Sequence, residues 1–266
     1  ILGQVLQAGC GQNPARQSAI NAGIDKEKTA TTINQVCGSG LAAVSLGFNF
    51  LKLNDANIVI AGGQESMTNS PHYLNYRMNE NLSEEKLKDT MLIDGLIDAY
   101  NNYHMGVTAE NVAEKYQITR NDQDHFAFNS QKKSIKAIEE NRFKEEIIPI
   151  KLKNQKIFEK DEYPRPDSTL EKLSTLKTVF KENGTVTAGN ASGINDGAAA
   201  VTLMSEDEAI KRKLQKLVSI KSWASCGVEP SLMGTGPIPS SKKALDLAGW
   251  SVKDVDLFEI NEAFAA

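Results

Sequence analysis

Short apolar runs and longer amphipathic segments alternate along the chain, and this pattern predicts an α/β protein. Residues 29–36 are rich in β-branched side chains, which is typical of a strand, and residues 41–53 are rich in Leu, Ala and Phe, which is typical of a helix. The apolar run at 57–63 predicts a buried strand that ends in glycines. A strand, a helix and a strand in this order favour a parallel crossover in an α/β core.

The middle of the chain, residues 68–187, carries most of the charged residues and reads as a largely helical, solvated insertion. Thr119 opens the pattern Thr-Arg-Asn-Asp, which indicates a helix N-terminus. Within this zone we expect a helix over 108–116, a helix after Thr119, a short edge strand over 146–152 and a loop over 163–167.

Apolar α/β character returns at about residue 185. The pattern predicts strands over 197–204, 217–223 and 255–260, with a helix over 240–249. The C-terminal part of the chain should therefore belong to the same α/β core as the N-terminal part.

Composition narrows the class of protein. The chain has 266 residues, a net charge of −4 and a pI of about 5.6, which argues against a nucleic-acid partner. We expect no membrane partner, because no apolar run approaches the length of a bilayer span. The three cysteines, Cys10, Cys37 and Cys226, are widely spaced, so we expect neither a disulfide framework nor a metal site, and a cytoplasmic location.

Cys37 lies between the first predicted strand and its helix, on a corner flanked by glycines. Near a helix N-terminus, free N–H groups and the helix dipole favour a thiolate, and a sharp strand-to-helix corner is one way to present a nucleophile. A lone cysteine is also commonly a small buried apolar residue. The local sequence leaves both interpretations open.

Three further segments are candidates for ligand contact. The small polar run 188–197 holds three glycines and could approach a ligand closely, or form a plain multi-turn loop. His104 precedes a predicted helix and is either structural or functional. Asn261 follows a predicted buried strand, where α/β sheets bind ligands, or it caps a helix.

The two ends of the chain suggest an internal fragment. Ile1 is not preceded by Met, and Ala266 stops the chain inside a predicted first helical turn. We therefore expect the natural protein to extend beyond both ends.

Seven stretches in this order resemble the thiolase family, and particularly its biosynthetic acetoacetyl-CoA thiolases. They are residues 5–16 (VLQAGCGQNPAR), 34–41 (NQVCGSGL), 61–67 (AGGQESM), 103–113 (YHMGVTAENVA), 183–200 (NGTVTAGNASGINDGAAA), 233–239 (MGTGPIP) and 261–266 (NEAFAA). The resemblance covers essentially the whole chain.

The resemblance implies a layered αβαβα core of two related halves with a helical loop domain, the C-terminal half being incomplete. Residues 1–67 with 198–218 would form the N-terminal half, 68–197 the CoA-binding loop domain, and 219–266 the start of the C-terminal half. It further implies a homodimer or homotetramer, and coenzyme A thioesters as substrates with no other cofactor.

The implied activity is the interconversion of two acetyl-CoA with acetoacetyl-CoA and CoA. Cys37 would be the nucleophile that carries the acetyl group, with its own N–H in an oxyanion hole, and Asn261 would hold a water that helps to bind the second thioester. The residues implied to contact substrate or CoA are Leu96, His104, Met105, Arg165, Ala188, Ser192, Met233, Ala263 and Phe264.

The sequence departs from the family in one respect. Thiolases carry an activating histidine in a Gly-His-Pro turn and a second cysteine in a Cys-x-Gly-Gly loop, and neither motif occurs here. Neither Cys10 nor Cys226 lies in such a motif. We therefore expect these 266 residues alone to be inactive in turnover. A degradative 3-ketoacyl-CoA thiolase and a non-catalytic CoA-binding fragment are the alternative interpretations.

Overall fold

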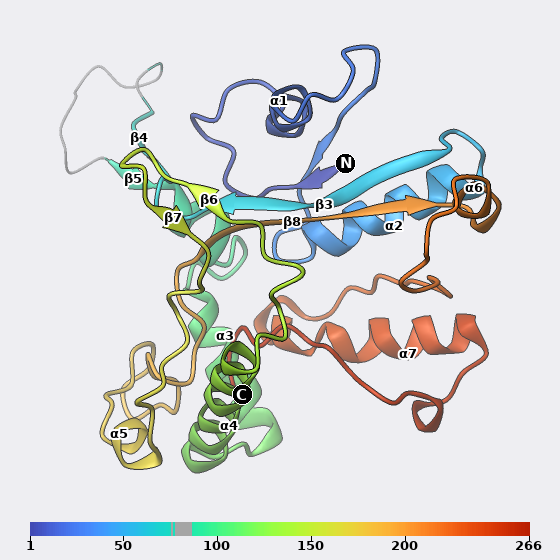
Figure 1. Ribbon diagram of the computed structural model, residues 1–266. Coiled ribbons are helices and arrows are strands. Elements are labelled where there is room, and N and C mark those ends of the chain that lie inside the picture. Colours follow the sequence, from blue (N-terminus) through green and yellow to red (C-terminus); the bar gives the residue numbers. More distant parts are fainter. Residues whose placement is uncertain (76, 78–86) are drawn as a thin grey trace. The chain divides into compact units, whose positions relative to one another are not determined.

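The computed structural model (Figure 1) describes residues 1–75, 77 and 87–266, which divide into two compact units. The first unit comprises residues 1–102, 194–226 and 238–256, and the second comprises 103–193, 227–237 and 257–266. The segments of each unit are thus contiguous in space although they are distant in sequence.

A four-stranded sheet forms the centre of the first unit, in the order β2-β1-β3-β8. Its strands are β1 (Leu2–Gly3), β2 (Thr32–Ile33), β3 (Ile58–Ser66) and β8 (Asp196–Met204). β1 pairs in parallel with β2 and β3, whereas β3 and β8 pair antiparallel along their full nine residues. The expected parallel crossover, from β2 through the following helix to β3, is therefore confirmed. In the sheet, β1 lies between β2 and β3.

Helix α2 (Ser39–Lys52) packs against this sheet and runs along β3 and β8 (Figure 1). The core between them is built on Ala43, Val59 and Ala61, which are all buried. Small side chains on the helix let its backbone approach the strands closely, which fixes the position of the helix N-terminus. The other elements of this unit are α1 (Pro14–Asn21), β4 (His72–Tyr73), β5 (Lys88–Asp89), the π-helix η3 (Met91–Leu96), α6 (Glu206–Lys211), nearly all of α7 (Pro237–Ala248) and η5 (Val252–Asp254).

The second unit is mostly helical. It contains α3 (Met105–Tyr116), α4 (Arg120–Glu139), the hairpin of β6 (Ile150–Lys151) and β7 (Ile157–Phe158), α5 (Leu170–Ser174) and the 3-10 helix η4 (Pro230–Thr235). Thr119 caps α4 in a capping box: its hydroxyl accepts from Asp122 N–H, and the Asp122 carboxylate accepts from Thr119 N–H. The hydrogen bonds to Thr119 hold the pKa of the Asp122 carboxyl below its ordinary value.

Most predicted elements are confirmed. The helices expected over 41–53, 108–116 and 240–249 correspond to α2, α3 and α7, and the helix after Thr119 is α4. The strands expected over 57–63 and 197–204 are β3 and β8, while 146–152 and 29–36 contain only the short β6 and β2. The loop over 163–167 is also found. None of the helices in the described part of the chain is long and apolar enough to cross a membrane.

The strands predicted over 217–223 and 255–260 are wrong. Both segments are irregular, and no strand of the described residues pairs with either. Leu217 and Leu257 are 93% and 89% exposed. An apolar pattern forms a strand only where another strand satisfies its backbone N–H and C=O groups, and that partner is what these segments lack here.

Candidate active site

Cys37 lies on a sharp corner between β2 and α2. Val36 just before it has a φ of 47°, in the left-handed region. That conformation is a genuine outlier for a β-branched residue and costs about 1–2 kcal/mol. Cys37 itself is exposed and immediately precedes Gly38, the N-cap of α2. Cys37 is therefore not a buried apolar residue in this structure, and its role as a nucleophile stays a prediction.

Ser39 holds the corner in shape. Its hydroxyl donates to Val36 O at 2.6 Å and accepts from Gln35 N–H at 2.8 Å. Ser39 is buried because β1 passes directly beneath it: a Cβ added to Gly3 would lie 2.5 Å from the Ser39 carbonyl carbon. The strained Val36 is thus held by the Ser39 hydroxyl, and Ser39 in turn packs against β1 at Gly3, where the strand has no side chain.

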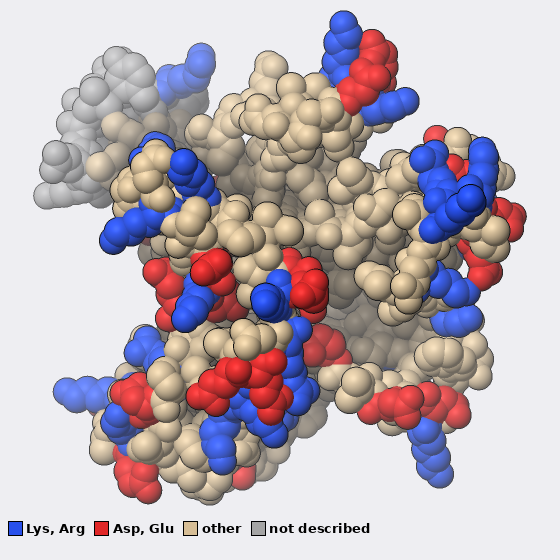
Figure 2. Space-filling view, in the orientation of Figure 1, with Lys and Arg blue, Asp and Glu red and all other residues tan. Residues whose placement is uncertain are grey.

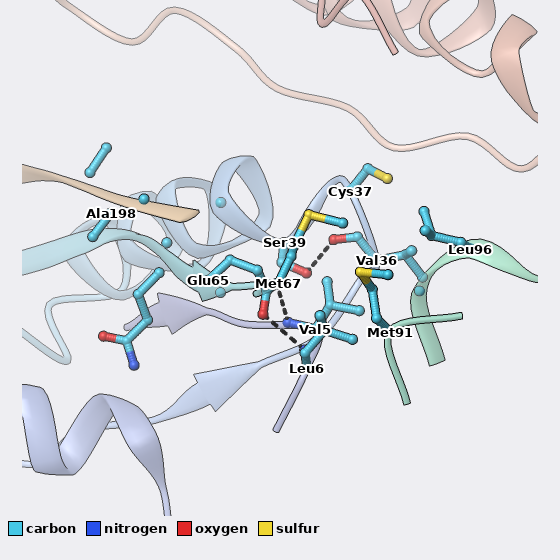
Figure 3. A pocket seen from close by; sticks show the side chains of 17 residues that line it. Val5, Leu6, Val36, Cys37, Ser39, Glu65, Met67, Met91, Leu96 and Ala198 are labelled. Atoms are coloured by element: carbon cyan, nitrogen blue, oxygen red, sulfur yellow. Dashed lines mark hydrogen bonds between the residues drawn. The ribbon is translucent and has the colours of Figure 1, made fainter. Parts of the chain in front are cut away.

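A pocket of about 480 Å³ opens beside Cys37, entirely within the first unit. Its walls are mainly apolar, and Leu96, at the end of η3, is one of the residues that line it. Figure 3 shows Cys37 at the edge of this pocket, with its sulfur directed away from the Glu65 carboxylate. The labelled lining residues are Val5, Leu6, Val36, Ser39, Glu65, Met67, Met91, Leu96 and Ala198. The pocket beside Cys37 is therefore lined mainly by apolar groups.

Glu65 fixes one wall of the Cys37 pocket. Its carboxylate accepts from Val5 N–H at 2.9 Å and from Leu6 N–H at 3.0 Å (Figure 3). Hydrogen bonds from neutral donors to an ionised acceptor are stronger than neutral pairs. The side chain thereby replaces a missing strand partner just beyond β1 and holds Val5 and Leu6 against the pocket.

In the second unit, His104 caps the N-terminus of α3. Its Nδ1 accepts from Gly106 N–H at 3.0 Å, so the ring proton of the neutral form must lie on Nε2. Burial lowers the pKa of His104, which favours that neutral form. The ring stacks on Phe180, with centroids 4.5 Å apart. His104 can therefore offer a fixed, uncharged Nε2–H donor.

Phe180 connects His104 to a second candidate residue, Phe264. The rings of Phe180 and Phe264 meet edge to face at 6.3 Å. Phe264 pairs with Ala191 in an isolated antiparallel bridge, and Ser192 N–H donates to Ala263 O at 2.9 Å. The predicted ligand segments near residues 192 and 264 are therefore joined through their backbones, although they are far apart in sequence.

Buried polar groups hold the loop that carries Ala188 and Ser192. The Glu110 carboxylate, 3% exposed, accepts from the N–H groups of Thr185 and Val186 at 2.8 Å and from the Thr185 hydroxyl at 2.8 Å. Asn190 donates from Nδ2 to Asp124 at 3.0 Å. These contacts bury the loop backbone at its start while Ala188 and Ser192 stay exposed.

The candidate residues fall into the two units. Cys37 and Leu96 share the pocket of the first unit. The other nine belong to the second unit: Asn261, His104, Met105, Arg165, Ala188, Ser192, Met233, Ala263 and Phe264. Met105 begins α3, Met233 lies in η4, which packs on α3, and Asn261 and Arg165 are exposed in irregular segments.

Sequence reasoning missed four supporting residues: Ser39, Glu65, Phe180 and Tyr163, whose hydroxyl donates to Ala191 O at 2.9 Å. Ser39 follows Cys37 by two residues, and Glu65 comes just after the strand predicted over 57–63. Both lie in motifs that carry the family resemblance, so the sequence could have indicated them. Phe180 and Tyr163 lie in irregular segments, and no spacing could reveal their partners. The described residues contain no group of three or more His, Cys, Asp or Glu side chains that could hold a metal ion.

Comparison with known proteins identifies matching domain families and related enzymes. Residues 1–207 match the family model "Thiolase, N-terminal domain", and residues 214–266 match "Thiolase, C-terminal domain". The acetyl-CoA acetyltransferases of Rhizobium meliloti and Paracoccus denitrificans are each 54% identical to this chain; the matches cover 100% of it and 68% and 69% of those proteins.

A solved structure shows the same fold. The crystal structure of the Bacillus anthracis acetyl-CoA acetyltransferase superposes with a TM-score of 0.95 at 42% identity, covering 99% of this chain and 68% of that one. The expected thiolase-like α/β fold is thereby confirmed. The two family models together cover nearly every residue, and the chain belongs to the thiolase family.

Proposed function

We propose that the protein is an acetyl-CoA C-acetyltransferase, which interconverts two acetyl-CoA with acetoacetyl-CoA and CoA. The observation that carries this proposal is the exposed Cys37 on a strained corner beside an apolar pocket, in a chain of the thiolase family. The relatives at 54% identity carry the name acetyl-CoA acetyltransferase, which favours acetyl groups over longer chains.

In the first half-reaction, the Cys37 thiolate attacks the thioester carbon of acetyl-CoA. A sulfur–carbon bond forms at Cys37, the bond to the CoA sulfur breaks, and CoA leaves as its thiolate and takes up a proton. Exchange between two thioesters is close to neutral in free energy, so catalysis depends on forming the Cys37 thiolate and on stabilising the charge on the thioester oxygen. We assign that task to the Cys37 N–H.

In the second half-reaction, the α-carbon of another acetyl-CoA loses a proton and attacks acetyl-Cys37, which releases the Cys37 thiolate and acetoacetyl-CoA. A fixed donor must stabilise the enolate oxygen, and a base must take the α-proton. We assign to Asn261 the water that meets this oxygen.

We further assign binding roles to the remaining candidates. Each role rests on the resemblance and is compatible with the exposure of these side chains. His104, Met105 and Leu96 would line the pantetheine cleft, Ser192 and Ala188 would contact the pantetheine, Arg165 would lie near the nucleotide, and Met233, Ala263 and Phe264 would close the acyl pocket. The domain boundaries 1–67 with 198–218, 68–197 and 219–266 remain a prediction, as do a homodimer or homotetramer and a cytoplasmic location.

The second half-reaction also sets a limit on these 266 residues. They contain neither a Gly-His-Pro motif nor a Cys-x-Gly-Gly motif. We therefore propose that these 266 residues bind CoA thioesters and accept an acetyl group slowly, without turnover. Turnover would need a histidine to activate Cys37 and a cysteine to move the α-proton.

Intact-mass analysis after incubation with acetyl-CoA tests the role of Cys37. The protein should gain the mass of one acetyl group, and C37S should gain none. Because Cys10 and Cys226 lie outside the proposed site, C10S and C226S serve as matched controls and should be acetylated like the wild type. Acetylation that persists in C37S would show that Cys37 is not the nucleophile.

A further inference from the structure

A second cavity, of about 690 Å³, lies in the second unit between α4 and the loop that carries Arg165. Its charged lining residues are Lys132, Lys133, Lys136, Arg165 and Glu139, a clear excess of positive charge. We call it the Lys132 pocket. Figure 2 shows charged side chains gathered over the part of the second unit that holds α4 and α5, whereas the face over β3 and β8 is largely uncharged.

Helix geometry places the cations on one side of the Lys132 pocket. Lys132 and Lys136 are one helical turn apart and therefore share a face of α4. Lys132 Nζ lies over the Phe128 ring at 5.4 Å, and Lys136 Nζ is 3.8 Å from Glu140, a long, exposed pair that is worth little. Both ammonium groups can therefore turn to an anion at small cost.

The opposite wall of the Lys132 pocket, the loop that carries Arg165, is held to α4 by a hydrogen bond from its backbone. Arg165 N–H donates to Gln131 Oε1 at 2.8 Å, which keeps the loop against the helix. The neighbouring Asp167 carboxylate is engaged by Lys172 at 2.8 Å, and that contact holds the pKa of Asp167 below its ordinary value. Glu139 is thus the acidic group in the lining that an incoming anion would meet.

Tyr163 connects the Lys132 pocket to the loop that carries Ser192. Its hydroxyl donates to Ala191 O at 2.9 Å, and the Arg165 guanidinium lies 5.9 Å from the centre of its ring. A Cβ added to Gly193 would lie 2.2 Å from Tyr163 Cε2, so the ring rests directly on this loop. Tyr163 therefore contacts both Arg165, which lines the Lys132 pocket, and the loop that carries Ser192.

We propose that Lys132 and Lys136 bind the 3′-phosphate of coenzyme A in this pocket. The inference rests on the proposed function, because it requires a CoA thioester whose pantetheine lies at Ser192. The nucleotide end of such a ligand carries a terminal phosphomonoester, which is close to a dianion at neutral pH and gains more from two ammonium groups than a singly charged diester does. A wide, open, basic pocket suits a terminal group of this kind.

Isothermal titration calorimetry with CoA and with 3′-dephospho-CoA tests the proposal. K132Q/K136Q should bind CoA about three- to tenfold more weakly than the wild type, as expected for two partly exposed charge contacts, and should bind dephospho-CoA equally well. E139Q removes a repulsive carboxylate and should bind CoA more tightly, again without a change for dephospho-CoA. The control K151Q/K153Q makes the same change in net charge on residues outside the pocket and should leave both affinities unchanged.

The outcomes separate this inference from the proposed function. If the wild type binds CoA and dephospho-CoA and K132Q/K136Q weakens both equally, or weakens neither, the 3′-phosphate is not held by these lysines, although the CoA site stands. If K151Q/K153Q lost as much affinity for CoA as K132Q/K136Q, net charge alone would explain the loss, and the assignment would be overturned. If the wild type binds neither ligand, the proposed function fails and the inference fails with it.

Discussion

The hydroxyl of Ser39 lies 2.6 Å from the carbonyl oxygen of Val36 and closes the corner that presents Cys37. The same hydroxyl accepts from Gln35 N–H at 2.8 Å. Val36 has a φ of 47°, which a valine adopts only where the surroundings compensate for the strain. One buried side chain thus holds two backbone groups, Gln35 N–H and Val36 O, just ahead of the candidate nucleophile.

Removing this hydroxyl should destabilise the protein and loosen the corner. S39A leaves Gln35 N–H without its acceptor, whereas Val36 O keeps only the hydrogen bond from Ser39 N–H, so we expect the free energy of unfolding to fall by about 1–3 kcal/mol. Urea unfolding measures the change, and intact-mass kinetics with acetyl-CoA should show slower labelling of Cys37. S45A is a matched control, because Ser45 makes an exposed bond to Leu41 O on the same helix; a loss in S45A as large as that in S39A would contradict a special role for Ser39.

Glu65 should contribute stability through its two backbone hydrogen bonds. In E65Q the amide can accept one of them, but its NH₂ group then faces the other backbone N–H. We expect a loss of about 1–3 kcal/mol in the free energy of unfolding, because a part-buried donor is left unsatisfied. E145Q, which alters an exposed glutamate, is the control and should unfold like the wild type. Equal urea midpoints for E65Q and the wild type would contradict the prediction.

Glu110 should decide how firmly the loop with Ser192 is held. The buried Glu110 carboxylate accepts hydrogen bonds from the N–H groups of Thr185 and Val186, and E110Q weakens them. We expect the free energy of unfolding to fall by about 2–4 kcal/mol. Hydrogen exchange should become faster at both amides. E114Q removes an exposed carboxylate of α3 that is paired with Lys181, so its effect should be about 0.5 kcal/mol or less. Unchanged exchange at Thr185 and Val186 in E110Q would disprove the anchoring role.

His104 should make stability depend on pH. Burial holds its pKa in the folded protein below the ordinary value of 6.5, so the unfolded chain binds more protons between those two values. The contribution of the neutral ring is complete above about pH 6.5 and is lost as the pH falls toward the folded pKa. Protonation also removes the Nδ1 lone pair that caps Gly106 N–H.

The variant H104N isolates this effect, because an asparagine oxygen can still cap α3 but does not titrate. The wild type should lose more free energy of unfolding than H104N when the pH is lowered through this window. Nitrogen-15 NMR of the wild type near neutral pH should find the His104 proton on Nε2. A proton on Nδ1, or parallel pH profiles for the two proteins, would refute this account.

The sequence by itself determined the elements whose cause is local. The periodicity of 41–53 and the capping pattern at Thr119 predicted α2 and α4, because amphipathic spacing and caps act within a few residues. The sequence also predicted that Cys37 lies between a strand and a helix, on a corner flanked by glycines. The ordered motifs then indicated the family and its candidate residues.

Only the tertiary structure decided what depends on partners distant in sequence. The segments 217–223 and 255–260 have apolar patterns typical of strands, yet they remain irregular because a strand requires a second backbone alongside it. The close approach of Gly3 to Ser39 and the stack of His104 on Phe180 likewise join groups that are far apart in the sequence. The sequence shows which residues are chemically able to act, and packing and hydrogen bonding decide which of them meet.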